Sequence, residues 1–263
     1  MKWARIWAMI LRHALLLFKD ANRIIWILYW PLVDIALWGF TANWVNTNQT
    51  TASTAGLTLI TAVVFWQLVN RAGFEVSSSL LEEFWSLNMV NIFATPIRIG
   101  EWIIATILLT VGTSLFVTFY CIGAVKLMYS INIFSIGIAV LPYLLSLFIA
   151  GLWISFVSSI FLIYFGARVQ SLAFMLTWLF APFIAAFYPL EILPAYGRII
   201  AYLLPMTYSF EGIRHLIQEG TFVPSLFWWG FVMSLVYCAG AIWGFKAAFV
   251  RSKEKGLARL TAD

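Results

Sequence analysis

The sequence predicts an all-α integral membrane protein with six transmembrane helices, an N-terminal amphipathic interfacial helix and a re-entrant helical hairpin between spans five and six. Of the 263 residues, 63% are hydrophobic and only 10% are charged, whereas soluble domains carry about 25% charged residues. The apolar runs are about 20 residues long, as membrane-spanning helices require, and do not alternate like the strands of a membrane β-barrel. We therefore expect a single transmembrane domain over residues 1–263.

Residues 2–20 are predicted to form an amphipathic helix that lies in the membrane interface. At about 100° per residue, basic residues share one side and apolar, tryptophan-rich residues share the other. The basic side holds Lys2, Arg5, Arg12 and Lys19, and the apolar side holds Trp3, Trp7, Ile10, Leu11, Ala14 and Phe18. A signal peptide is the alternative, but Lys19, Asp20 and Arg23 interrupt the apolar run and no small-residue cleavage site follows it.

Six apolar runs are long enough to span a membrane. They cover residues 24–43, 54–74, 102–125, 136–164, 169–187 and 227–250. The fourth run can tilt or kink at Pro142, and Pro182 breaks the fifth. With both termini in the cytoplasm, thirteen of the 16 lysine and arginine residues lie on the inner side. The positive-inside rule therefore predicts a multi-pass protein with both termini cytoplasmic.

Asp34 lies near the middle of the first predicted span. A carboxylate at that depth costs roughly 2.5–3.5 kcal/mol on insertion scales, so it is expected to face protein or water. It is either a polar group on a translocation path or subunit interface, or a hydrogen-bond partner of a neighbouring span, for instance of a Ser or Thr. Arg71 and Glu75, four residues apart, are expected to form an ion pair along one helix.

The connection between the fifth and sixth spans, residues 188–224, contains several prolines and charges. Proline blocks a continuous helix, and irregular backbone at membrane depth requires protein or water to satisfy its polar groups. The segment is either an ordinary interfacial loop or an outer-face re-entrant hairpin. The residues that mark it are Pro189, Glu191, Pro194, Pro205, Glu211 and Arg214.

The polar stretch between the second and third spans is the main candidate for docking to a partner. We expect a short helix there that ends before Pro96, with two acids and two large aromatic residues near its start. These are Glu82, Glu83, Phe84 and Trp85. Exposed aromatic side chains can anchor a partner and the charges can orient it. An ordinary solvated loop helix is the alternative.

The sequence supports no enzymatic activity of its own. It has no Gly-x-x-x-x-Gly-Lys-Ser/Thr loop, no nucleophile elbow and no HExxH motif, so the chain is not expected to be an ATPase. Cys121 and Cys238 lie in apolar runs without metal-ligand spacing, and His13 and His215 lie in different kinds of region. No catalytic, cofactor-binding or metal-binding residue is predicted. The basic residues sit at span ends, which does not indicate a nucleic-acid partner.

Two stretches resemble the type-2 ABC exporter permeases, and the resemblance extends over nearly the whole chain. YPLEILP, a short amphipathic run and LLPMTYSFEGIR precede the last span, as in that family. Glu82, Glu83, Thr95 and Pro96 match the glutamate-rich start and Thr-Pro end of its coupling helix. The resemblance implies a homodimeric permease in the cell inner membrane, in contact with membrane lipid. It also implies two copies of an ATP-binding cassette subunit, which would bind ATP and Mg.

The resemblance also implies where substrate passes. In that family the first and fifth spans line the path between two subunits. The matching residues here are Trp26, Trp30, Asp34, Trp178 and Phe183. Polysaccharide exporters carry an Arg-Tyr-type motif and a Leu-Gly-x-x-Trp element ahead of the first span, and residues 18–40 lack both. This favours export of a lipid-like, drug-like or other amphipathic substrate.

Three alternatives remain open. The first is a polysaccharide or lipid-linked glycan export permease of the same family. The second is an ATP-independent transporter or channel, against which stand the few mid-membrane ionisable groups and the absence of an inverted repeat. The third is a membrane scaffold or assembly factor.

Overall fold

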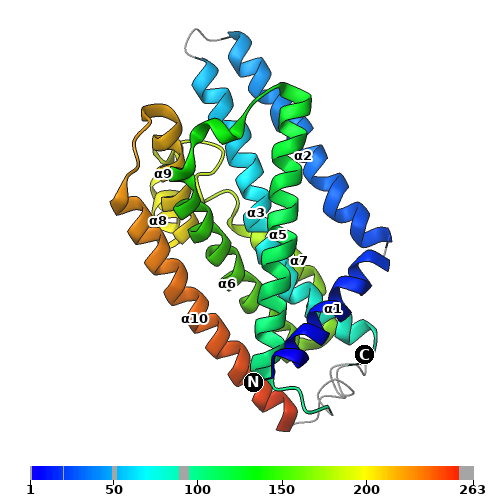
Figure 1. Ribbon diagram of the computed structural model, residues 1–263. Coiled ribbons are helices and arrows are strands. Elements are labelled where there is room, and N and C mark those ends of the chain that lie inside the picture. Colours follow the sequence, from blue (N-terminus) through cyan, green and yellow to red (C-terminus); the bar gives the residue numbers. More distant parts are fainter. Residues whose placement is uncertain (1, 20, 49–51, 89–94, 255–263) are drawn as a thin grey trace.

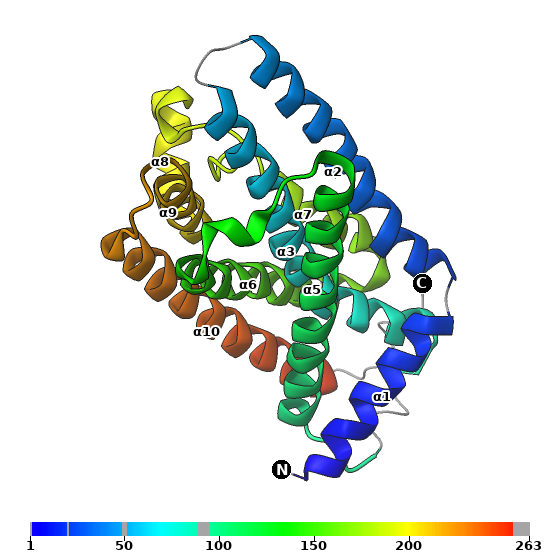
Figure 2. The same ribbon diagram turned by 45° about the horizontal axis from the view of Figure 1, so that its top comes forward.

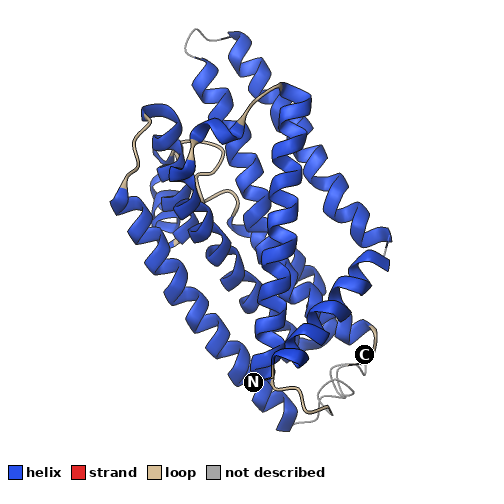
Figure 3. Cartoon of the chain, viewed as in Figure 1, coloured by secondary structure: helices blue, strands red, loops and turns tan. Residues whose placement is uncertain are grey.

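The computed structural model describes residues 2–19, 21–48, 52–88 and 95–254. In these ranges the chain is helical with short turns and loops, and it contains no strand (Figure 3). The α-helices there are α1 (Trp3–Lys19), α2 (Ala21–Asn48), α3 (Ala52–Trp85), α5 (Ile99–Tyr129), α6 (Leu141–Phe165), α7 (Gln170–Phe180), α8 (Ala195–Leu203), α9 (Pro205–Glu219) and α10 (Pro224–Glu254). Short 3₁₀ turns cover Ile133–Ile136, Ile138–Val140, Gly166–Val169 and Leu190–Ile192. The predicted all-α class is confirmed.

The long helices run lengthwise and α1 lies across one end of them (Figure 1). We call this the α1 end: it comprises α1, the last turn of α3 and the first turn of α5. The short helices α8 and α9 lie towards the opposite end (Figures 1 and 2).

Five segments within the described residues are long and apolar enough to cross a membrane. They are Arg23–Trp44, Ala55–Trp85, Ile99–Tyr129, Ile138–Phe180 and Pro224–Glu254. This indicates a membrane protein. The predicted count of six spans is not confirmed, because the fourth and fifth predicted spans, 136–164 and 169–187, both overlap one 43-residue segment, Ile138–Phe180.

The fifth predicted span, residues 169–187, is not one continuous helix, in agreement with the break expected at Pro182. Helix α7 has 11 residues, and at 1.5 Å per residue it is about 16 Å long, against about 30 Å for the hydrocarbon layer. It ends at Phe180 because Pro182 has no N–H to continue the helix. Residues 181–189 follow as turns and irregular chain.

Helices α3 and α6 form the centre of the molecule. On α3, the side chains of Val63, Val64, Phe65, Trp66 and Val69 are each at most 1% exposed. The two helices approach closely at a glycine: a Cβ added to Gly151 would lie 2.6 Å from Ala72 Cβ and 2.7 Å from the Val69 carbonyl oxygen. Small residues allow such close backbone packing between apolar helices.

The predicted docking helix does not begin at Glu82. Helix α3 has 34 residues and continues to Trp85, so Glu82 to Trp85 form its last turn. The helix extends beyond the predicted span because it keeps an apolar face against the rest of the protein, on which Val76, Leu80, Leu81 and Phe84 are buried. Helical periodicity, rather than the local polarity of the sequence, therefore determines where α3 ends.

Candidate functional site

The last turn of α3 is held to α1 and α2 by ion pairs. Arg12 of α1 donates both terminal guanidinium nitrogens to the Glu83 carboxylate, with Nη2 to Oε2 at 2.8 Å. Arg23 of α2 donates to Glu82 at 2.8 Å and to the Ser78 hydroxyl at 3.0 Å. The buried His13 ring has Nδ1 3.5 Å from Glu82 and Nε2 3.6 Å from Glu83.

These contacts give the basic face of α1 a different role from the one predicted. Arg12 faces buried carboxylates of the protein, and its hydrogen bond to Glu83 raises the pKa of the Arg12 guanidinium, so it stays charged. The apolar side points outward instead, where Trp3 is 65% and Trp7 is 53% exposed. The predicted helix is confirmed over Trp3–Lys19, and its location in a membrane interface remains a prediction.

Helix α1 is also tied to the start of α5. The Glu101 carboxylate accepts the backbone N–H of Lys2 at 2.9 Å and that of Arg98 at 3.1 Å. Arg5 lies 3.6 Å from Glu101 and donates to the Pro96 carbonyl oxygen. Of the predicted docking residues, Thr95 and Pro96 thus lie on the chain that leads into α5, and the intervening residues 89–94 lie outside the described residues.

The side chains of the predicted docking residues differ in their exposure to solvent. Glu83 is fully buried in its pairing with Arg12, and Phe84 is only 2% exposed. The expectation of an exposed Phe84 is therefore wrong, because this residue lies on the packed face of α3. Trp85 is 58% exposed, and its indole N–H donates to the Gln170 side-chain oxygen of α7 at 3.2 Å.

A groove of about 590 Å³ runs between α1 and the end of α3. Its lining residues are Ala8, Leu11, Arg12, Leu15, Leu16, Lys19, Glu82 and Ser86. The walls are mainly apolar, with a basic edge on α1 and one carboxylate on α3. The α1 end thus combines an apolar groove with an exposed tryptophan.

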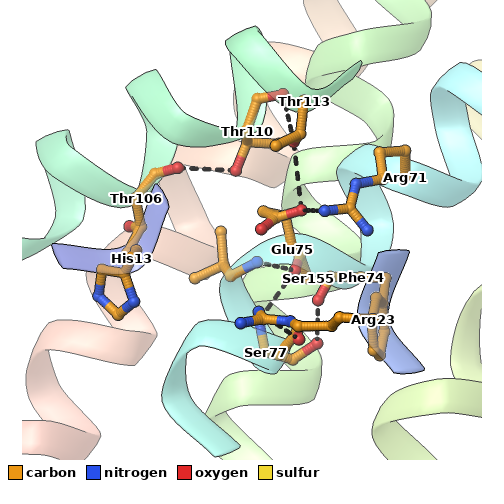
Figure 4. A network of polar contacts seen from close by, with 12 residues as sticks. His13, Arg23, Arg71, Phe74, Glu75, Ser77, Thr106, Thr110, Thr113 and Ser155 are labelled. Carbon is orange, nitrogen blue, oxygen red and sulfur yellow. Dashed lines mark hydrogen bonds and ion pairs between the residues drawn. The ribbon is translucent and has the colours of Figure 1, made fainter. Parts of the chain in front are cut away.

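A second polar cluster joins α3, α5 and α6 further inside (Figure 4). Arg71 pairs with Glu75 along α3, as predicted, and the Thr113 hydroxyl of α5 donates to Glu75 Oε2 at 3.2 Å. Ser155 of α6 accepts the backbone N–H groups of Val76 and Ser77 at 3.0 and 3.2 Å. The cluster links three long helices, and we assign it a structural role.

Asp34 accepts a hydrogen bond from the side-chain amide of Gln67 at 2.8 Å. A structural hydrogen bond to a neighbouring span is thus present, but the partner is Gln67 of α3 rather than a Ser or Thr. No lysine, arginine or histidine within the described residues pairs with Asp34. Gln67 was not among the predicted residues, although an amide inside an apolar run is a visible signal.

Of the predicted path residues, Trp178 belongs to an aromatic cluster that joins α2, α3 and α7. Trp38 of α2 stacks on Phe187 with ring centroids 4.9 Å apart, and Trp66 of α3 lies 6.2 Å from the same ring. Trp66 also contacts Trp178 of α7 at 5.6 Å. Trp26 and Trp30 lie outside this cluster on the exposed face of α2, with their ring centroids 5.3 Å apart and their planes tilted. Phe183 is half-buried. Phe187 links Trp38 of α2 to Trp66 of α3 and was not among the predicted path residues.

The irregular chain after α7 is held by Arg214 of α9. Its Nη2 donates to the carbonyl oxygens of Ala185, Ala186 and Tyr188 at 2.8, 3.4 and 2.9 Å. Glu211 pairs with Arg214 and accepts the Leu190 N–H at 3.0 Å. The expectation that protein groups satisfy this backbone is confirmed for these residues.

The other marked residues shape the same connection. Pro189 precedes the 3₁₀ turn Leu190–Ile192, in which Glu191 is exposed. Pro194 precedes α8, and Pro205 is the first residue of α9. Two short helices therefore lie between α7 and α10. Whether they re-enter a membrane stays a prediction.

Within the described residues, no three His, Cys, Asp or Glu side chains gather as a metal site would require. The chain matches no protein-family model and no curated protein sequence.

Proposed function

We propose that this chain is the membrane subunit of an ATP-driven ABC exporter, working as a homodimer with two separate ATP-binding cassette subunits. The sequence resemblance over the segments 82–96 and 187–214 motivates the proposal. The observation that carries it is Trp85, an exposed tryptophan at the tip of the longest described helix, beside the groove of the α1 end. Exposed tryptophans are frequent anchors of protein interfaces.

In this proposal the α1 end faces the cytoplasm, both termini are cytoplasmic, and the partner subunits bind ATP and Mg. Closure of the two partner subunits would move the tips of the α3 helices. Because α3 is one continuous helix that carries both Trp85 and the aromatic cluster around Trp66, movement at its tip would reach the substrate region. The short helix α7, the irregular chain after it and the helices α8 and α9 would form the outer part of the path and complete a six-span arrangement.

The homodimer would form through α2 and α7. Both helices expose large apolar side chains, among them Trp26 and Trp30 on α2 and Met175 and Trp178 on α7. An amphipathic, lipid-like or drug-like substrate would move along the seam between the two copies. A face rich in tryptophan and low in charge suits such a substrate.

Affinity capture of the tagged chain from its native membranes tests this proposal. Bound ATP-binding proteins are labelled with 8-azido-ATP and identified by mass spectrometry. We expect an ATP-binding cassette protein with the wild-type chain and its loss with Trp85→Ala. The matched control is Trp229→Ala, since Trp229 is 61% exposed near the start of α10, where the neighbouring Gly230 packs against α9. Capture of no such protein, or equal capture by Trp85→Ala, would contradict the proposal.

A further inference from the structure

One strip of α2 combines a carboxylate with three indoles. Trp26, Trp30, Asp34 and Trp38 follow one another at intervals of four residues, so they lie on successive turns of the same side of the helix. We call these four residues the Trp–Asp strip. The rings of Trp26 and Trp30 lie 5.3 Å apart in a tilted arrangement, and these residues are 64% and 46% exposed. Asp34 is half-buried on the next turn, and Trp38 turns inward onto Phe187.

The Asp34 carboxylate is only partly compensated. Gln67 donates to Oδ2 at 2.8 Å, and within the described residues Asp34 has neither a further hydrogen bond nor a basic partner. A membrane-embedded carboxylate normally pairs with another side chain or lines a substrate pathway. An amide donor supplies no positive charge, so no group of the described residues compensates the charge of Asp34 when it is ionised.

The indole rings and the carboxylate both favour a positively charged ligand. The face of a tryptophan ring attracts cations, and groups of aromatic rings are a common means of binding quaternary ammonium ions. An anionic headgroup would be repelled by Asp34, and a neutral sugar would leave the carboxylate uncompensated. A metal ion requires several oxygen or nitrogen ligands, and no three His, Cys, Asp or Glu side chains of the described residues gather for one.

We propose that the Trp–Asp strip binds the positively charged headgroup of a cationic amphiphile, such as an alkyl or aryl ammonium compound. Asp34 would neutralise the headgroup, Trp30 would contact it through its ring face, and the exposed Trp26 would contact the apolar body. Gln67 would hold the carboxylate in place. This inference rests on the export function proposed above and narrows its substrate class to cations.

Binding of a permanently charged probe tests the inference directly. Tetraphenylphosphonium and tetraphenylborate have nearly the same shape and opposite charge, so their comparison isolates the effect of charge. Equilibrium dialysis of the full chain in lipid nanodiscs, corrected with empty nanodiscs, gives the affinity for each ion. We expect tetraphenylphosphonium to bind the wild-type protein at least tenfold more tightly than tetraphenylborate.

Variants of the strip supply the decisive comparison. Asp34→Asn keeps a hydrogen-bonding partner for Gln67 but removes the charge, and it should weaken tetraphenylphosphonium binding by at least about tenfold. Asp34→Glu should restore most of the affinity. Trp30→Ala should weaken binding about two- to fivefold and Trp30→Phe less. The controls Glu219→Gln and Trp243→Ala change an exposed acid and an exposed tryptophan outside the strip and should leave affinity unchanged.

Wild-type affinity in Asp34→Asn, or equal binding of the two ions by the wild-type protein, would overturn the inference. If Asp34→Asn does not yield monodisperse protein, the Trp30 series decides, and equal affinity of Trp30→Ala and the wild type then overturns it. The measurement uses no ATP-binding subunit. Its failure therefore leaves the capture experiment of the proposed function untouched, and failure of that capture leaves a demonstrated cation site standing.

Discussion

Replacing Arg214 by methionine tests whether one side chain holds the irregular chain after α7. Methionine retains a long apolar stem but removes every donor. The carbonyl oxygens of Ala185, Ala186 and Tyr188 would lose their Arg214 donor, and Glu211 would lose its ionic partner. Removing one partner of a buried ion pair costs about 3–5 kcal/mol, and a buried acceptor left unsatisfied costs about 1–3 kcal/mol. Because these effects overlap, we expect a total loss of about 3–5 kcal/mol.

Thermal unfolding of purified protein in detergent measures this effect. At about 2–4 °C per kcal/mol for a chain of this size, Arg214→Met should lower the midpoint by at least about 6 °C. Arg214→Lys keeps the charge but lacks the planar fork and should fall in between. Arg198→Met is the matched control, because Arg198 is exposed on α8. An unchanged midpoint for Arg214→Met would refute the assigned role of Arg214.

Three further predictions use other contacts. Gly151→Ala should destabilise the protein by about 1–3 kcal/mol through overpacking against Ala72, whereas Gly112→Ala, with open space around it, should be neutral in the same unfolding assay. Arg12→Gln should lower the free energy of unfolding by about 3 kcal/mol, because Glu83 stays buried without its partner. Adding Glu83→Gln should recover part of that loss, and a double-mutant cycle measures how much. For topology, an impermeant thiol reagent added to intact cells should label Asn48→Cys and fail to label Trp3→Cys; labelling of position 3 from outside would contradict cytoplasmic termini.

The overall helical character and most helix positions could be predicted from the sequence because long apolar runs leave few other structures in a membrane. The predicted spans 24–43, 102–125 and 227–250 lie within α2, α5 and α10. The break after α7 could also be predicted, because Pro182 has no N–H to continue a helix. The irregular course of residues 181–189 could not be predicted, because it depends on hydrogen bonds to Arg214, which a hydropathy pattern does not report.

Polar contacts between helices were the least predictable feature of the candidate site. Arg71 and Glu75 could be paired from the sequence because both lie on one helix four residues apart. The partners Arg12 and Glu83 are 71 residues apart in sequence, and nothing local marks them as neighbours. The same holds for Asp34 and Gln67, which meet only because α2 packs against α3.

Glu82 and Glu83 form ion pairs within the protein, and this changes how a partner would recognise the α1 end. Two acids followed by two aromatic residues suggested that the charges orient a partner and the rings anchor it. In the structure Glu83 is neutralised by Arg12, Glu82 is paired with Arg23, and Phe84 is buried. A partner docking at this end would therefore meet Trp85 and the mainly apolar groove rather than a negative patch. We thus expect such docking to depend on Trp85 and to change little with salt, because exposed charge pairs would contribute little to it.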